Sequence, residues 1–185
     1  MIKINSLAFQ IPRLPVTGAA VRALIMLVLA FALHLPQSAH AQASARESSL
    51  VVASDLRAEA SMAAAQGKAY VVLFSETGCP WCERARREFL LPMQEDPQFQ
   101  GKAVFRQVNV DSDAALKDFD GRASTQHRFA VSQGVRLYPT VMLYTPEGKE
   151  AAARLRGYTS SVYYGSSIEQ RIEMARAKTA RPEKN

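Results

Sequence analysis

The only two cysteines of this chain are Cys79 and Cys82, which are separated by Pro80 and Trp81. They follow the apolar run 70–74 and open a stretch with a helical pattern. The amide N–H groups and the dipole at a helix N-terminus favour the thiolate of the first cysteine. The second cysteine lies one turn further on, close enough to attack a mixed disulfide and release a partner. The pair is therefore predicted to exchange two electrons between its thiol and disulfide forms.

Other uses of the cysteine pair fit the sequence less well. A structural zinc site needs four Cys or His ligands, which two thiols and scattered histidines do not supply. A c-type haem attachment needs a histidine directly after the second cysteine, where this chain has Glu83. A bridge between Cys79 and Cys82 closes too short a loop for much entropic stabilisation. A structural or inert pair, or a metal shared between two molecules, stays open as an alternative, and we expect no cofactor and no metal site within one chain.

Residues 1–41 have the pattern of a signal peptide. The uninterrupted apolar run 23–33 is shorter than the roughly 20 residues that span a bilayer. Ala39 and Ala41 form a small-x-small cleavage pattern. Three basic residues and no acidic residue precede the cleavage point: Lys3, Arg13 and Arg22. We therefore expect export, with a bacterial periplasm as the best-fitting compartment and an uncleaved inner-membrane anchor as the alternative.

The net charge of +6 comes partly from this leader, because it holds three of the 23 basic residues and none of the 17 acidic ones. The basic balance is therefore no argument for a nucleic-acid partner. After cleavage we expect no stable insertion into the membrane.

The remaining chain has the length of one ordinary domain. We divide it into an N-terminal loose lead-in over 42–54, a domain over 55–177 and a flexible basic tail over 178–185. Pro92 is expected to end or kink the helix after the cysteines, with an irregular connection over 93–101. Hydrophobic patterning predicts the following elements: helix 55–66, strand 69–75, helix 83–91, strand 103–110, an interrupted helix 114–134, strands 140–144 and 151–155, and helix 161–177.

The order of these elements predicts an α/β sheet with helices on both faces. At this point several motifs resemble the thioredoxin-like superfamily, within it a small exported, periplasmic thiol:disulfide oxidoreductase. The resemblance covers about 56–174 and implies a thioredoxin fold. In that fold a central mixed β-sheet is flanked by helices on both faces, and the CxxC motif lies at a helix N-terminus. The matching stretches are 71–74, 78–82, 108–111, 134–140, 148–149 and 156–158.

The resemblance also implies roles for individual residues. Cys79 corresponds to the attacking cysteine and Cys82 to the resolving one. Pro139 corresponds to the proline after a cis peptide bond, which lies against the dithiol, and Tyr138 offers backbone groups to an extended substrate. Without the resemblance, an ordinary trans proline at the start of a strand is the alternative for Pro139. Both residues between the cysteines are expected at the substrate-positioning rim: Pro80 and Trp81.

The chain departs from thioredoxin in two places. Leu73 stands where thioredoxin carries a buried acid in the strand ahead of the dithiol. Glu76 is the nearest carboxylate and the candidate for proton transfer, with a solvated loop residue as the alternative. Additional residues near 92–102 and 113–128 form either a partner-facing surface or a decoration of the fold.

Another open point is a cluster of three basic residues in the cysteine helix: Arg84, Arg86 and Arg87. They either favour the thiolate of Cys79 or form ion pairs on a solvated helix face with Glu83 and Glu88, and we prefer the ion pairs.

Three functions follow as hypotheses. The first is an exported oxidoreductase that acts on disulfides of proteins or small molecules, preferably as a reductase kept reduced by a membrane electron shuttle. The second is an adaptor or chaperone with an incidental dithiol. The third is a glutathione-dependent, glutaredoxin-like enzyme.

Overall fold

The computed structural model describes residues 49–180. Its central sheet has four strands in the order β2-β1-β5-β6. β1 runs parallel to β2 and antiparallel to β5, and β6 is antiparallel to β5, so the sheet is mixed. All seven residues of β1 are buried, as expected for a central strand covered on both faces. The strand bounds are Ala69–Ser75 for β1, Ala103–Asn109 for β2, Thr140–Tyr144 for β5 and Glu150–Arg156 for β6.

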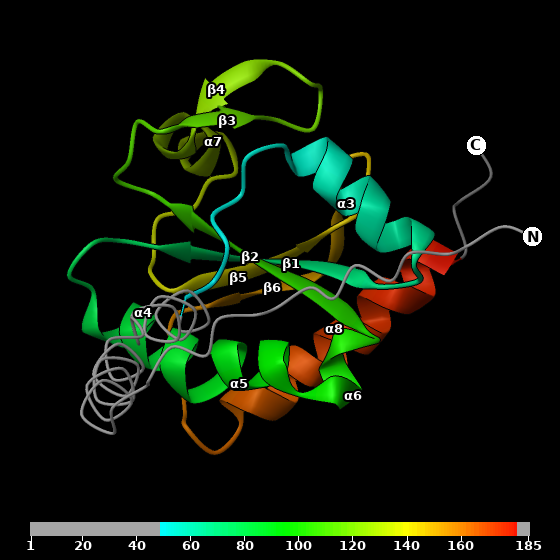
Figure 1. The fold of residues 1–185 in the computed structure, drawn as a ribbon. Coiled ribbons are helices and arrows are strands. Elements are labelled where there is room, and N and C mark those ends of the chain that lie inside the picture. Colours follow the sequence, from blue (N-terminus) through cyan, green and yellow to red (C-terminus); the bar gives the residue numbers. More distant parts are fainter. Residues whose placement is uncertain (1–48, 181–185) are drawn as a thin grey trace, which may run out of the picture. The chain divides into compact units, whose positions relative to one another are not determined.

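Helices cover both faces of this sheet (Figure 1). Because side chains alternate along a strand, β1 sends Val71 and Leu73 into one core and Tyr70, Val72 and Phe74 into the other. The first core lies against α4, α5, α6 and α8, and the second against α3 and α7. The helix bounds are Leu56–Ala65 for α3, Pro80–Ala85 for α4, Leu91–Glu95 for α5, Pro97–Gln100 for α6, Gln126–Ser132 for α7 and Tyr164–Ala180 for α8. The predicted α/β class and the strands over 69–75 and 140–144 are confirmed.

The predicted helix over 114–134 is wrong in its first half. A separate antiparallel hairpin, made of β3 (Ala115–Lys117) and β4 (Ala123–Thr125), replaces it. The Asp118 side chain closes the turn by accepting hydrogen bonds from the N–H groups of Asp120 and Arg122. Such local side-chain acceptors compete with helix formation. In α7, Phe129 packs into the core at 3% exposure, whereas Val131 is 62% exposed.

Pro92 was predicted to end or kink the helix that carries the cysteines, and the helix does not end there. A π-helical turn, Arg86–Leu90, follows α4, and α5 continues the helix to Glu95. In that turn the Leu91 N–H donates to the Arg86 carbonyl, one residue further back than in an α-helix. Pro92 then falls in the first turn of α5, where a proline is tolerated. The connection predicted to be irregular contains the end of α5 and the short α6.

The segment before α3 is also more ordered than the predicted loose lead-in. Within the described part of the lead-in, the Ala53 N–H donates to the Gln107 carbonyl, and the Gln107 N–H donates to the Val51 carbonyl. At the other end, α8 extends three residues beyond the predicted helix, to Ala180. No helix within residues 49–180 has the length and apolar character needed to cross a bilayer. The predicted signal peptide and the residues after 180 lie outside the described residues.

Candidate functional site

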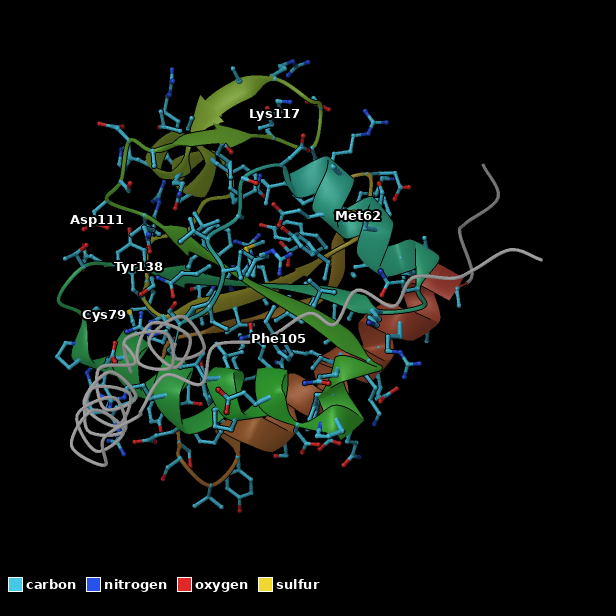
Figure 2. The ribbon with its side chains drawn as sticks, in the orientation of Figure 1. Met62, Cys79, Phe105, Asp111, Lys117 and Tyr138 are labelled. Atoms are coloured by element: carbon cyan, nitrogen blue, oxygen red, sulfur yellow. A yellow bond between two sulfur atoms is a disulfide. The ribbon has the colours of Figure 1, made fainter. Side chains whose placement is uncertain are left out.

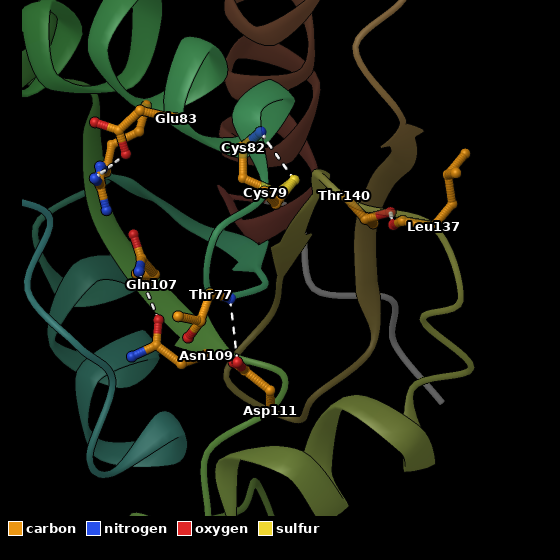
Figure 3. Close-up of a disulfide and its surroundings, with 10 residues drawn as sticks. Thr77, Cys79, Cys82, Glu83, Gln107, Asn109, Asp111, Leu137 and Thr140 are labelled. Atoms are coloured by element: carbon orange, nitrogen blue, oxygen red, sulfur yellow. Dashed lines mark hydrogen bonds and ion pairs between the residues drawn. A yellow bond between two sulfur atoms is a disulfide. The ribbon is translucent and has the colours of Figure 1, made fainter.

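The two cysteines form a disulfide at the N-terminus of α4 (Figure 3). Cys79 is the N-cap, and its Sγ accepts a hydrogen bond of 3.2 Å from the Cys82 backbone N–H. The two Cα atoms are 5.3 Å apart. Cys82 is only 2% exposed, whereas Cys79 is partly exposed. An incoming sulfur therefore reaches Cys79, and the helix N–H groups around it favour a thiolate at that position.

A short loop delivers Cys79 from the end of β1 to the start of α4. Gly78 has φ +73°, a left-handed conformation that glycine adopts without strain. The Thr77 N–H donates to Oδ2 of Asp111 at 3.2 Å, which ties the loop to the segment after β2. Hydrogen bonding from Thr77 lowers the pKa of the Asp111 carboxyl, so this acceptor stays charged near neutral pH. The loop is thus held by backbone conformation and by a contact to the neighbouring strand.

The peptide bond between Tyr138 and Pro139 is cis, as the resemblance implies, so the trans alternative is wrong. Pro139 is buried directly before β5, where Thr140 pairs with Phe74 near the end of β1. This register brings Pro139 to the end of the sheet that carries the dithiol. Figure 2 shows Tyr138 and Cys79 at this same end. The Gly157 N–H donates to the Pro139 carbonyl at 2.7 Å and fixes the strand that follows.

The position that holds a buried acid in thioredoxin is occupied in this chain by an apolar residue that solvent does not reach. Leu73 is 1% exposed and belongs to the core beneath α4. Glu76 is an exposed loop residue on the rim of a cavity of about 490 Å³ beside the cysteine loop. The structure brings Glu76 to the same cavity as Cys79, and proton transfer by Glu76 stays a prediction.

Polar residues that the sequence did not single out line the same cavity. Gln107, in β2, is 8% exposed, and its Nε2 donates to Oδ1 of Asn109 at 2.6 Å. Figure 3 shows Gln107 on the side of the loop where Glu83 projects from α4. Among the described residues, Oε1 of Gln107 and Nε of Arg86 are buried without a hydrogen-bond partner. Gln107 within the predicted strand 103–110 is the signal that the sequence offered.

The arginines of the cysteine helix are paired with glutamates, as preferred from the sequence. Nε of Arg84 lies 2.9 Å from Oε1 of Glu88. Glu83 pairs with Arg86 and also lies 3.7 Å from Nη1 of Arg87. These partners offset the positive charge that would otherwise favour the thiolate of Cys79.

The two residues between the cysteines lie at the surface. Pro80 is exposed at the first position of α4, where a proline fits the helix start. Trp81 is 52% exposed and stacks on Tyr158, with ring centroids 5.7 Å apart. Within residues 49–180, no group of three or more His, Cys, Asp or Glu side chains could hold a metal ion. The site therefore consists of a dithiol, a cis-proline strand and a half-exposed aromatic rim.

Comparison with known proteins identifies the family to which this chain belongs. Residues 56–170 match the family described as a thioredoxin-like domain. Among solved structures, the chain is similar to a thioredoxin from Thermus thermophilus, with 19% identity, coverage of 71% of this chain and 91% of that one, and a TM-score of 0.46. It is also similar to Trxlp from Edwardsiella tarda, with 25% identity, coverage of 60% and 91%, and a TM-score of 0.44. No curated protein matches the sequence. Because the family match spans more than half of the chain, and a CxxC disulfide lies at a helix N-terminus, the protein belongs to the thioredoxin-like family and is a thiol–disulfide oxidoreductase.

Proposed function

We propose that this protein is an exported reductase of protein disulfides. In the first step, the Cys79 thiolate attacks one sulfur of a client disulfide, forms a mixed disulfide and displaces one client thiolate. The Cys82 thiolate then attacks Sγ of Cys79, closes the Cys79–Cys82 disulfide and displaces the second client thiolate. The two client thiolates each take up one proton, so two electrons and two protons reach the client. An external dithiol must afterwards reduce the Cys79–Cys82 disulfide.

The observation that carries the proposal is the unequal exposure of the two sulfurs. Cys79 is partly exposed at the helix N-terminus, and Cys82 is 2% exposed one turn below it. A client reaches only the first sulfur, while the second is held within reach of the mixed disulfide. A merely structural bridge gains nothing from this asymmetry, and its short loop stabilises little.

The charges around the dithiol support reduction rather than oxidation. A strong oxidant owes its high potential to a stabilised thiolate in the reduced form. Here the three arginines that follow Cys82 have glutamate partners, and Glu76 adds a further negative charge beside the loop. The thiolate of Cys79 therefore receives its stabilisation mainly from the helix N-terminus, which favours a lower reduction potential.

The location rests on the leader pattern of residues 1–41. In an oxidising compartment a reductase needs a steady supply of electrons, so we propose a membrane-bound dithiol donor as the redox partner. Fractionation of cells that produce the full chain tests the location. Recovery of a shortened, processed chain in the periplasmic fraction is expected, whereas full-length protein in the membrane fraction would indicate an uncleaved anchor.

The decisive experiment is a redox titration of the Cys79–Cys82 couple. Equilibration with dithiothreitol or glutathione buffers, followed through Trp81 fluorescence, is expected to give a potential nearer the about −270 mV of thioredoxin than the about −120 mV of a strong oxidant. A value above about −150 mV would make the protein an oxidase.

Insulin reduction with dithiothreitol is the companion assay. An unchanged insulin rate would favour the adaptor, and strict dependence on glutathione would favour a glutaredoxin-like enzyme.

A further inference from the structure

Four aromatic side chains form a continuous layer beside the dithiol. We call Trp81, Phe89, Tyr158 and Tyr164 the aromatic layer. Trp81 stacks on Tyr158 at 5.7 Å, and Tyr158 packs against Tyr164 at 4.9 Å between ring centroids. Phe89 contacts both tyrosines, at 6.1 Å from Tyr158 and 5.3 Å from Tyr164. Tyr158 is therefore the ring that joins Trp81 to the core.

Polar contacts hold the same ring in place. The Tyr158 hydroxyl donates to Oε2 of Glu88 at 2.7 Å, and Nε of Arg84 donates to the other oxygen of that carboxylate at 2.9 Å. The guanidinium carbon of Arg84 lies 5.2 Å from the Tyr158 ring centroid and 5.6 Å from that of Trp81. These distances are typical of cation–π contacts. The hydrogen bonds from Tyr158 and Arg84 lower the pKa of Glu88, which keeps the acceptor charged near neutral pH.

Two backbone features bring the layer together. Glu88 and Phe89 lie in the π-helical turn Arg86–Leu90, whose extra residue per turn changes the direction of the side chains that follow α4. Gly165, in the first turn of α8, lets that helix approach Phe89, because a Cβ atom there would lie 3.0 Å from Cδ1 of the ring. The π turn and Gly165 together allow Phe89 to pack against the two tyrosines of the aromatic layer.

From this geometry we infer that Tyr158 is a positioning residue of the redox site, acting through Trp81. One face of Trp81 rests on Tyr158, while 52% of the tryptophan remains exposed next to the attacking cysteine. A side chain that is already ordered loses less entropy when a protein client packs against it. A small aliphatic disulfide needs only the sulfur of Cys79. The inference rests on the proposed function and adds that Tyr158 favours protein clients over small disulfides.

The test compares Tyr158→Ala with two other variants. Tyr158→Phe keeps the ring stack and loses only the hydroxyl. Tyr163→Ala is the matched control, because Tyr163 is 69% exposed in the neighbouring loop. For Tyr158→Ala we expect a KM for insulin about 3- to 10-fold higher with kcat nearly unchanged, the range that follows from the strength of an aromatic pair. The rate with hydroxyethyl disulfide should change less than about twofold. Tyr163→Ala should stay close to the wild type, and Tyr158→Phe, which keeps the ring stack but loses the hydrogen bond to Glu88, should have a KM for insulin between those of the wild type and Tyr158→Ala.

Trp81 is the only tryptophan, so its fluorescence reports on the layer without any substrate. Tyr158→Ala should red-shift the Trp81 emission and increase its quenching by acrylamide, and Tyr163→Ala should not. Equal losses with insulin and with hydroxyethyl disulfide, or an unchanged KM for insulin, would overturn the inference. A wild-type protein that reduces neither substrate would instead end the proposed function, and the role of Tyr158 in turnover with it.

Discussion

Strand β2 carries two polar clusters on opposite faces, and they differ in how completely their groups are paired. On the α3 side, Arg106 and Tyr70 meet Glu59, a trio that we call the Glu59 network. Glu59 is 9% exposed and accepts hydrogen bonds from the Tyr70 hydroxyl at 2.9 Å and from Nε of Arg106 at 2.7 Å. The backbone N–H groups of Ser54 and Asp55 also donate to it, at 2.9 and 3.1 Å. This cluster ties α3, the segment before it, β1 and β2 together.

The protonation of the Glu59 network follows from these contacts. Burial raises the pKa of Glu59, but the hydrogen bonds from Ser54, Asp55 and Tyr70 and the charge of Arg106 outweigh it, so the pKa is lowered. Burial and the neighbouring carboxylate raise the pKa of Tyr70, so its hydroxyl keeps its proton and remains a donor. Glu59 and Tyr70 thus hold the charge states that the contacts need.

On the α4 side, the next residue of β2, Gln107, faces the cavity beside the dithiol. Its Oε1 has no hydrogen-bond partner among the described residues, and neither has Nε of Arg86. Glu76 and Glu83 line the same space; Glu76 is exposed, and Glu83 is half-buried and paired with Arg86. On the α3 face of β2 the Glu59 carboxylate therefore has several hydrogen-bond donors, whereas in the cavity beside the dithiol Gln107 and Arg86 each keep one buried polar atom without a partner among the described residues.

Removal of either cysteine should have the strongest consequence. Cys79→Ser should reduce insulin turnover to the uncatalysed rate, because the attacking sulfur is gone. Cys82→Ser should still complete the first exchange and accumulate mixed disulfides with clients, which non-reducing gels detect. Trapping by Cys79→Ser instead of Cys82→Ser would reverse the roles of the two cysteines.

The second largest effect, on stability, is expected when the Glu59 network is disrupted. Glu59→Ala leaves Arg106 without its carboxylate partner and should lower the free energy of unfolding by about 3 kcal/mol in urea denaturation. The matched control is Asp120→Ala, because the Asp120–Arg122 pair is largely exposed and should contribute less than about 0.5 kcal/mol. The reduction potential of Glu59→Ala should equal that of the wild type. A shifted potential would show that the two clusters of β2 are coupled.

The pH dependence of the free energy of unfolding tests the charge state of Glu59. Since folding lowers the pKa of Glu59, its stabilisation is complete above the usual glutamate pKa of 4.5 and is lost as the pH falls through the lower folded value. Glu59→Gln removes this titration. The difference in unfolding free energy between wild type and Glu59→Gln should therefore shrink from pH 7 towards pH 3. A difference that is constant over this range would contradict the lowered pKa.

The smallest effect on stability is expected from a substitution of Gln107, in the cavity beside the dithiol. Gln107→Leu removes one hydrogen bond to Asn109 together with a buried acceptor that has no partner, so the two contributions largely cancel. The free energy of unfolding should change by less than about 1 kcal/mol. A loss above about 2 kcal/mol, within the usual cost of a buried group left unpaired, would show that Gln107 belongs to a saturated network like that of Glu59.

Sequence patterning predicted the regular parts of the fold well. The apolar runs over β1 and β5 were predicted as strands and form buried ones, and Asp55, at the predicted start of the first helix, caps α3 by accepting from the Ala58 N–H at 3.0 Å. The hairpin over 115–125 was missed because its signal is a local turn at Asp118 rather than a periodic pattern. Glu59 was missed although it lies on the inward stripe of α3, because its partner Arg106 is 47 positions away.

The cis bond before Pro139 was implied by the family resemblance, whereas residue order alone predicted the reactive pair and its place between an apolar strand and a helix. These features are local, since each is read from a few neighbouring residues and their order. Which polar groups are paired could be learned only from the folded chain, because pairing depends on segments such as α3 and β2 that meet through the packing of the sheet. The same holds for Tyr158, whose contact with Glu88 spans 70 positions and depends on a π turn that no periodic pattern announces.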